Sequence, residues 1–191
     1  MTWISKNQQY LTYSEAMNNA QIVIDQLINT GNGWVKESLC ALVGNMYRES
    51  TINPDLYEFG YDWSEDRGFG LCQWTPRSKL SNWANSEGLN YRLGDTQVKR
   101  IHYEAVNNVQ WLDDTNFYYN PTGHIYSFTE FITNSRGYTL EELTIDFCWH
   151  YERPGVGYGN ESLQSKGIPF AKDAFVNLVP KTATTFFSIL K

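Results

Sequence analysis

Long apolar stretches and blocks of positive charge are both missing from this sequence of 191 residues. No apolar run approaches the roughly 18 residues that cross a bilayer, so we expect no membrane insertion. Fifteen basic residues stand against 21 acidic ones, and no cluster of Lys and Arg is present. That balance excludes a protein that binds the phosphate backbone of nucleic acids. The first residues lack a basic segment followed by an apolar one, so we expect no secretory signal.

Cysteine and histidine are scarce, with three of each. Cys40, Cys72 and Cys148 are far apart and form no Cys-x-x-Cys pair. An odd, scattered set supports neither a disulfide framework nor a zinc site, so we expect buried thiols. The histidines are scattered too, and none lies at metal-ligand spacing from a carboxylate. We therefore predict no metal and no cofactor.

Aromatic residues are abundant: seven Trp, 13 Tyr and 10 Phe make up 16% of the chain. Rings with an apolar face and a polar edge suit sugar stacking as well as core packing. A dense group lies in residues 55–74, where glycines interrupt any helical period. We expect this segment to form a short β-hairpin. Its Tyr57, Tyr61 and Trp63 are predicted to line glycan subsites, and a large aromatic core is the alternative.

Signals for helix starts recur along the rest of the chain. Capping-box spacing occurs at Thr12–Glu15, Ser127–Glu130 and Thr139–Glu142. Thr75-Pro76 has the residue types of an N-cap followed by proline at the first helical position, and Asp95 is a further candidate N-cap. Helices are therefore expected over roughly residues 12–30, 35–50, 75–88 and 95–112. Three more are expected, one after Ser127, one after Thr139 and one after Gly167. The helix that follows Thr139 must stop before Pro154.

These signals predict a mainly α fold of the α+β kind, with one small β lobe inserted early. We expect a single domain over residues 1–180. Residues 181–191 are expected to be a C-terminal tail or the start of a linker.

The helix expected over residues 35–50 carries a carboxylate on its apolar side. Its apolar stripe consists of Val35, Leu39, Leu42 and Met46. Glu49 lies seven residues after Leu42, so its side chain projects within about 20° of that stripe. Partial burial and the negative end of the helix dipole would both raise its pKa. A carboxyl group protonated near neutral pH suits the general acid of a glycosidase. The alternative is a glutamate that bends into solvent as the helix end frays.

Three motifs follow one another in a specific order and spacing. They are Glu49-Ser50 at a helix end, the turn Gly68-Phe-Gly-Leu-Cys-Gln-Trp-Thr-Pro76, and Tyr151-Glu-Arg-Pro154. In this order the sequence resembles the phage tail-tip lysozyme family over residues 34–180. It is more distantly similar to soluble lytic transglycosylases and goose-type lysozymes. Cys72 stands where the distant relatives often have Met, and a clear Ala-Tyr-Asn segment is missing.

The resemblance implies a lysozyme-like fold with a helical lobe, a small β-hairpin lobe and a cleft between them. It implies Glu49 as the catalytic acid, with Gln73 near its carboxyl group and Tyr151 among the substrate-binding residues. For the second carboxylate, Asp62 between two aromatic residues is the candidate. The other acidic residues of the segment, Glu58, Glu65 and Asp66, remain alternatives.

The activity that the resemblance implies is that of a muramidase. Such an enzyme cuts the β-1,4 bond between N-acetylmuramic acid and N-acetylglucosamine in peptidoglycan. The expected place is a bacteriophage tail tip, made in the host cytoplasm, with peptidoglycan strands and other tail proteins as partners. A lytic transglycosylase, a holin-released endolysin and a non-catalytic glycan-binding tail module remain alternatives. Because transglycosylases need no second carboxylate, the sequence does not separate them from hydrolases.

Overall fold

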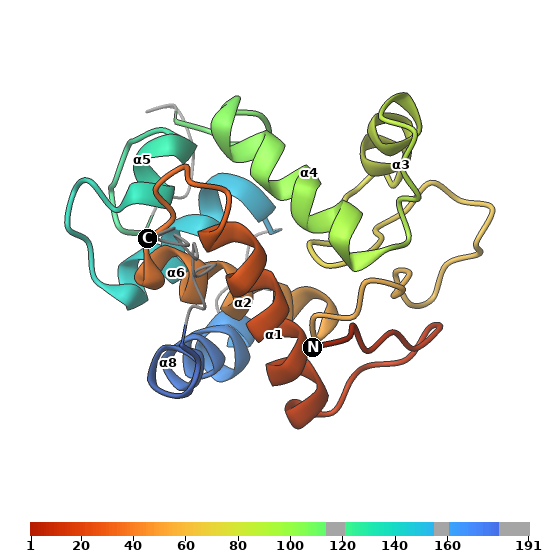
Figure 1. Cartoon of the computed structure of the whole chain (residues 1–191), viewed down its shortest axis with the longest axis horizontal. Helices are drawn as coiled ribbons and strands as arrows, with labels where there is room; N and C mark the ends of the chain where they lie inside the picture. Colours follow the sequence, from red (N-terminus) through yellow and green to blue (C-terminus); the bar gives the residue numbers. More distant parts are fainter. Residues whose placement is uncertain (114–120, 155–160, 180–191) are drawn as a thin grey trace, which may run out of the picture.

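The structure, a computed structural model, describes residues 1–113, 121–154 and 161–179. The expected tail at 181–191 lies outside the described residues. The described chain is mainly helical, as predicted (Figure 1). Its helices are α1 (Tyr13–Ile28), α2 (Lys36–Ser50), α3 (Ser78–Ser86), α4 (Gly94–Val106), α5 (Phe128–Thr133), α6 (Leu140–Phe147) and α8 (Ile168–Asn177), together with the one-turn π-helices η1 (Cys148–Glu152) and η2 (Leu163–Gly167). Within these stretches no helix is long and apolar enough to cross a membrane.

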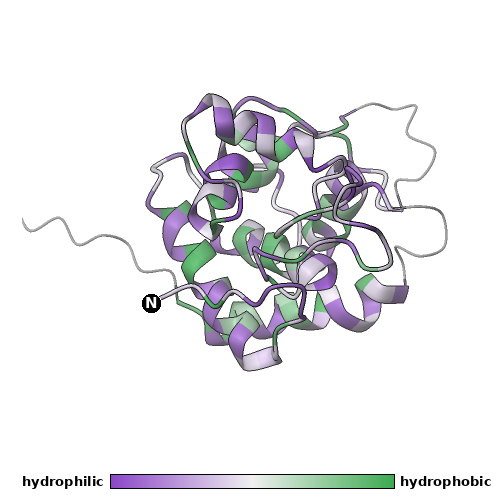
Figure 2. Ribbon diagram, turned by 90° about the vertical axis from the view of Figure 1, so that its right-hand side faces the viewer, coloured by the Kyte–Doolittle hydropathy of each residue, from purple (hydrophilic) through white to green (hydrophobic). Residues whose placement is uncertain are grey.

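Helix α2 is the axis of the fold. It packs against α1, α5, α6, α8 and η2. Leu39, Leu42 and Met46 of the predicted apolar stripe are fully buried, whereas Val35 lies just before the helix and is half-buried. Hydrophobic and hydrophilic positions alternate along the surrounding helices (Figure 2), and most of their buried residues are apolar. A Cβ at Gly44 would come within 2.6 Å of the Gly167 carbonyl oxygen, so this glycine permits the close approach of α8. The last turn of α2 is therefore held on a rigid, buried support.

The predicted capping boxes are confirmed at the starts of α1, α5 and α6. In each, the N-cap hydroxyl accepts a hydrogen bond from the backbone N–H three residues on. The glutamate at that position accepts one from the N-cap N–H in return. Each box satisfies two backbone donors that a helix start leaves unpaired.

Two other predicted helix starts are wrong in detail. Thr75-Pro76 does not begin a helix: α3 starts at Ser78, where the Asp66 carboxylate accepts a hydrogen bond from the Ser78 N–H at 2.8 Å. Helix α4 begins at Gly94, ends at Val106 rather than near 112, and has no side-chain N-cap. The Asp95 carboxylate instead accepts hydrogen bonds from other segments of the chain, so tertiary contacts replace the expected local cap.

The predicted β-hairpin over residues 55–74 is not seen. The segment has one isolated antiparallel bridge, between Tyr57 and Phe69, flanked by two 2.9 Å backbone hydrogen bonds. Beyond the bridge the chain turns around a side chain, because the Tyr57 hydroxyl lies 2.6 Å from the carbonyl oxygens of both Asp62 and Glu65 and donates its proton between them. These bonds draw the chain into turns where cross-strand pairing would be needed. Residues 55–74 therefore form a folded loop beside the end of α2.

Candidate active site

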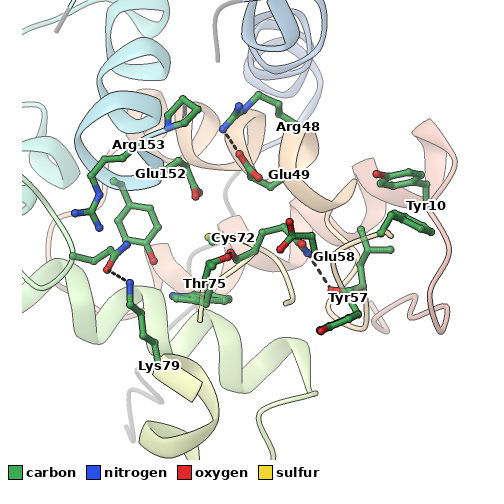
Figure 3. A pocket seen from close by; sticks show the side chains of 17 residues that line it. Tyr10, Arg48, Glu49, Tyr57, Glu58, Cys72, Thr75, Lys79, Glu152 and Arg153 are labelled. Atoms are coloured by element: carbon green, nitrogen blue, oxygen red, sulfur yellow. Dashed lines mark hydrogen bonds and ion pairs between the residues drawn. The ribbon is translucent and has the colours of Figure 1, made fainter. Parts of the chain in front are cut away.

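A cavity of about 920 Å³ opens where the end of α2, the folded loop of residues 55–74 and η1 meet. Figure 3 shows its lining side chains, with Tyr10 at one end and Lys79 and Arg153 at the other. Carboxylates lie between these ends. The structure thus brings together segments that are about 100 residues apart in the sequence.

Glu49 lies in the last turn of α2 and lines this cavity, with its side chain 21% exposed. It forms an ion pair with Arg48. Burial raises the pKa of Glu49, Arg48 opposes that effect, and the charge of Glu58 adds to it, so the pKa lies above its usual range. The side chain is therefore largely buried, as its position on the apolar stripe predicts, and this burial favours the protonated form of the carboxyl group.

Ser50, the second residue of the Glu-Ser motif, has a structural role. Its buried hydroxyl contacts the carbonyl oxygen of Met46 at 3.1 Å and that of Leu71 at 3.0 Å. Leu71 belongs to the glycine-rich turn across the cavity. Ser50 thus fastens the end of α2 to that turn and fixes the distance between Glu49 and the opposite wall.

Glu152, at the end of η1, is the carboxylate that the sequence analysis did not identify. It lines the same cavity, and its buried Oε1 has no hydrogen-bond partner among the described residues. Burial and the charge of Glu49 raise its pKa well above the usual range, although Arg48 and Arg153 oppose them. The charge of Glu49 thus disfavours ionisation of Glu152, so the two carboxyl groups of this cavity do not ionise independently.

The π-helical turn explains why helical periodicity does not place Glu152. The Arg153 N–H bonds the Cys148 carbonyl at 2.9 Å, five residues back, so each side chain of η1 is rotated from its α-helical position. The signal that was available is the resemblance, since Glu152 stands inside the Tyr151-Glu-Arg-Pro motif.

A buried network fixes the wall beside Glu152. Glu104, which is 1% exposed on α4, accepts hydrogen bonds from the Tyr151 hydroxyl and from Trp74 Nε1, and it pairs with Arg100 at 2.7 Å. Tyr151 and Trp74 both line the cavity. Tyr151 is itself 1% exposed, so it forms part of the cavity wall.

Gln73 lines the cavity from the glycine-rich turn, with a left-handed backbone at φ 45°. Its amide nitrogen donates to the carbonyl oxygens of Leu56 and Gly70 at 3.1 Å each, and so holds the turn closed. A Cβ at Gly70 would come within 2.5 Å of Gln97 Oε1, so only glycine fits there. In this structure Gln73 is directed towards the backbone of the loop rather than towards Glu49.

The three predicted aromatic residues lie in two places. Tyr57 lines the main cavity but is only 2% exposed. Tyr61 and Trp63 line a smaller neighbouring cavity of about 430 Å³. The guanidinium of Arg67 lies 4.0 Å from the Tyr61 ring centre, and that of Arg92 lies 5.4 Å from the Trp63 ring centre. One face of each exposed ring is thus already in contact with a cation.

Two other rings border the main cavity. Tyr10 and Phe59 are 57% and 47% exposed, and their centres are 4.9 Å apart. Tyr10 comes from the segment before α1, so no local motif connects it with the site. These rings offer the exposed aromatic surface of the main cavity.

Asp62, the candidate second carboxylate, is exposed and does not line the cavity. A hydrogen bond from Ser64 lowers its pKa, which keeps it ionised. Among the alternatives, Glu58 lines the cavity and accepts a hydrogen bond from the Gly68 N–H, whereas Glu65 and Asp66 do not line it. Of the four candidates for the second carboxylate, only Glu58 lines the cavity with Glu49 and Glu152.

The expectation of buried thiols is confirmed, because all three cysteines are free and buried. Cys72 lines the cavity, and burial raises the pKa of its thiol well above the usual range. A thiol that stays protonated is a poor nucleophile, so the cavity's chemistry rests on its carboxyl groups.

Comparison with known proteins places this geometry in a family. Residues 18–176 match the family described as phage tail lysozyme. The chain is also similar to Morphogenesis protein 1 of Bacillus phage B103, with 39% identity over 150 residues. That alignment covers 78% of this chain and 37% of the relative, so this chain spans well under half the relative's length. The match of the family over most of the sequence, around a cavity with paired carboxyl groups, shows that this chain belongs to the phage tail lysozyme family.

Proposed function

We propose that this chain is a muramidase that hydrolyses the β-1,4 bond between N-acetylmuramic acid and N-acetylglucosamine in peptidoglycan. The observation that supports it most is the pair of partly buried carboxyl groups, Glu49 and Glu152, in one cavity. Glycosidases of most families use two carboxyl groups on either side of the scissile bond, with one kept protonated.

In this proposal the pair enters the reaction with one proton between its two members. Glu49 donates that proton to the glycosidic oxygen as the bond breaks. In the reacting form Glu152 is the ionised partner. It faces the positive charge developing on the sugar ring, orients the attacking water and accepts the proton that this water loses. The Arg48 guanidinium, paired with Glu49 in the resting site, stabilises the carboxylate that remains after proton transfer.

The second carboxylate favours hydrolysis over transglycosylation. In a transglycosylase the muramyl 6-hydroxyl attacks the anomeric carbon, so no second carboxylate is needed to activate water. Glu152 also argues against a non-catalytic glycan-binding module. Burying a carboxyl group whose Oε1 lacks a partner costs folding free energy, and glycan binding alone gives no reason to retain it.

The place of action that we propose is the phage tail tip, where the chain would open the cell wall for DNA entry. Membership of the phage tail lysozyme family supports a tail component. The name of the B103 relative describes a role in morphogenesis in that phage. Other tail proteins are therefore proposed partners, beside the glycan strands themselves.

Mass spectrometry of the products from purified peptidoglycan tests the reaction. A muramidase leaves reducing N-acetylmuramic acid ends, and these are the expected result. Products with 1,6-anhydro ends would identify a transglycosylase instead. Reducing N-acetylglucosamine ends would contradict the muramidase assignment, because they arise from the other glycosidic bond of the strand.

A further inference from the structure

The main cavity is electrically polarised along its length. In Figure 3, Tyr10 marks one end, the carboxyl groups of Glu49 and Glu152 occupy the middle, and Lys79 and Arg153 lie at the far end. The proposed chemistry uses the middle of the cavity. It leaves the cationic end without an assigned role.

Arg153 differs from every other arginine in the described stretches. Five of them form ion pairs, and a sixth, Arg77, donates a hydrogen bond to the Trp63 carbonyl. Arg153 alone has neither a side-chain hydrogen bond nor an ion pair within that part of the chain. Its backbone is nevertheless left-handed, at φ 54°, which is costly for a residue with a side chain. A residue with an unfavourable backbone conformation therefore places a guanidinium group without an ion-pair partner among the described residues at the cavity.

Lys79 brings a second cation to the same end. It lies in the first turn of α3, and the only hydrogen bond of its side chain among the described residues is to Gln110 Oε1 at 3.4 Å. Burial lowers the pKa of Lys79, and the charge of Arg153 lowers it further, because the two cations repel each other. Gln110, which also lines the cavity, has a left-handed backbone at φ 68°. Two like charges held together in a cavity form a ready receptor for an anion.

We infer that the Lys79–Arg153 end is a subsite for a carboxylate carried by the muramyl residue, either on its lactyl group or on its stem peptide. This inference rests on the proposed function, since it names which glycan the same cavity prefers. A guanidinium matches a carboxylate with two parallel hydrogen bonds, and an ammonium adds a point charge. The carboxylates in the middle of the cavity repel a polyanion, so an isolated carboxylate on an otherwise neutral sugar chain fits best.

Three forms of one soluble glycan test the subsite. The first carries stem peptides. The second has been stripped by an amidase, so that each lactyl group ends in a free carboxylate. In the third, the lactyl carboxylates have been converted to neutral amides. The rate of reducing-end release gives kcat/KM for each form, with wild type and with Lys79→Gln/Arg153→Gln. Lys99→Gln/Arg136→Gln removes the same charge from exposed sites outside the cavity and serves as the matched control.

We expect wild type to prefer the charged forms over the amide form, and the double variant to lose about 10- to 100-fold of that preference, mainly through KM. Loss of preference for the amidase-stripped form alone identifies the lactyl carboxylate as the ligand, because the lactyl carboxyl group of the peptide form is held in an amide bond. Loss for the peptide form alone identifies a carboxylate of the stem peptide, and loss for both shows that the subsite accepts either carboxylate. Equal cleavage of all three forms by wild type would overturn the inference. So would a preference that falls equally in the charge-matched control.

The failure of the proposed function is separately visible. If wild type releases reducing ends from none of the forms, muramidase activity is refuted. Binding of the same three forms to Glu49→Gln is therefore measured by calorimetry. Tighter binding of a charged form, lost on adding the Lys79 and Arg153 substitutions, supports the subsite whatever the catalytic result. Equal binding of all forms overturns it.

Discussion

Replacing Glu152 by glutamine tests the coupling between the two carboxyl groups. The substitution keeps the size of the side chain and removes its charge. Glu49 must be protonated to act as a general acid, so activity falls as pH rises through its pKa. The charge of Glu49 opposes ionisation of Glu152, and a charge on Glu152 must oppose ionisation of Glu49 to the same extent. Without that charge the pKa of Glu49 falls, and the alkaline limb of the pH–activity profile moves to lower pH.

The size of the effect follows from Coulomb's law. At an effective dielectric constant of about 20, two unit charges interact by roughly 3 kcal/mol at ~5.5 Å and roughly 1.7 kcal/mol at ~9.5 Å, the range of carboxyl separations in glycosidases. One pKa unit corresponds to about 1.36 kcal/mol. The alkaline limb of Glu152→Gln should therefore lie about 1 to 2 pH units below that of wild type. Arg48 lowers the pKa of Glu49 in both proteins, so it does not account for the shift between them.

The assay is reducing-end release from soluble glycan strands between pH 4 and 9, at constant ionic strength. If Glu152 also orients water, the rate at the optimum falls about 10²- to 10⁴-fold. Carbon-13 NMR of labelled glutamate carboxyl groups then gives the same titration without turnover. Asp62→Asn is the control, because Asp62 is exposed and lies outside the cavity. An alkaline limb that stays in place or moves upward in Glu152→Gln would refute the coupling.

Further substitutions test the glycine-rich turn. Gly70→Ala should lower stability by more than about 2 kcal/mol, because a left-handed backbone and a contact with Gln97 both oppose the new Cβ. Gly60→Ala, also left-handed but with open space around it, should cost only about 1 kcal/mol; equal losses in urea unfolding would contradict this. Gln73→Ala should weaken lysis and cost about 1–2 kcal/mol through two lost hydrogen bonds to backbone carbonyls, while thermal unfolding stays cooperative. Full lytic activity in Gln73→Ala would contradict the expectation that activity depends on Gln73.

Local signals predicted the helical part of the fold well. The capping boxes and the apolar stripe of α2 depend on residues that are close together in the sequence, so a short stretch of sequence is enough to predict them. The 55–74 segment was predicted less well. Its aromatic residues and glycines are typical of paired strands, but the Tyr57 hydroxyl and the arginine–ring contacts hold it as turns. Such contacts cannot be read from alternation along one segment.

The candidate site was predicted in part for the same reason. Glu49 lies in the cavity because helical periodicity placed it on the buried side of α2. Glu152 was missed because a π-turn rotates it away from α-helical register and because its partner is about 100 residues away. Tyr10 and Arg153 likewise reach the cavity only through tertiary packing. The order of the motifs indicated the family, whereas the grouping of charges in the cavity required the structure.

The most direct test of the account is Glu49→Gln, with lysis and stability measured on the same preparation. Clearing of a peptidoglycan suspension should fall by about 10²- to 10⁴-fold, the usual contribution of a general acid. The melting temperature should change little, because a neutral amide avoids the cost of burying the charge of Glu49 but weakens the contact with the buried Arg48 side chain, so the two effects oppose each other. Full lytic activity in a folded Glu49→Gln protein would contradict the central claim that this carboxyl group supplies the catalytic proton.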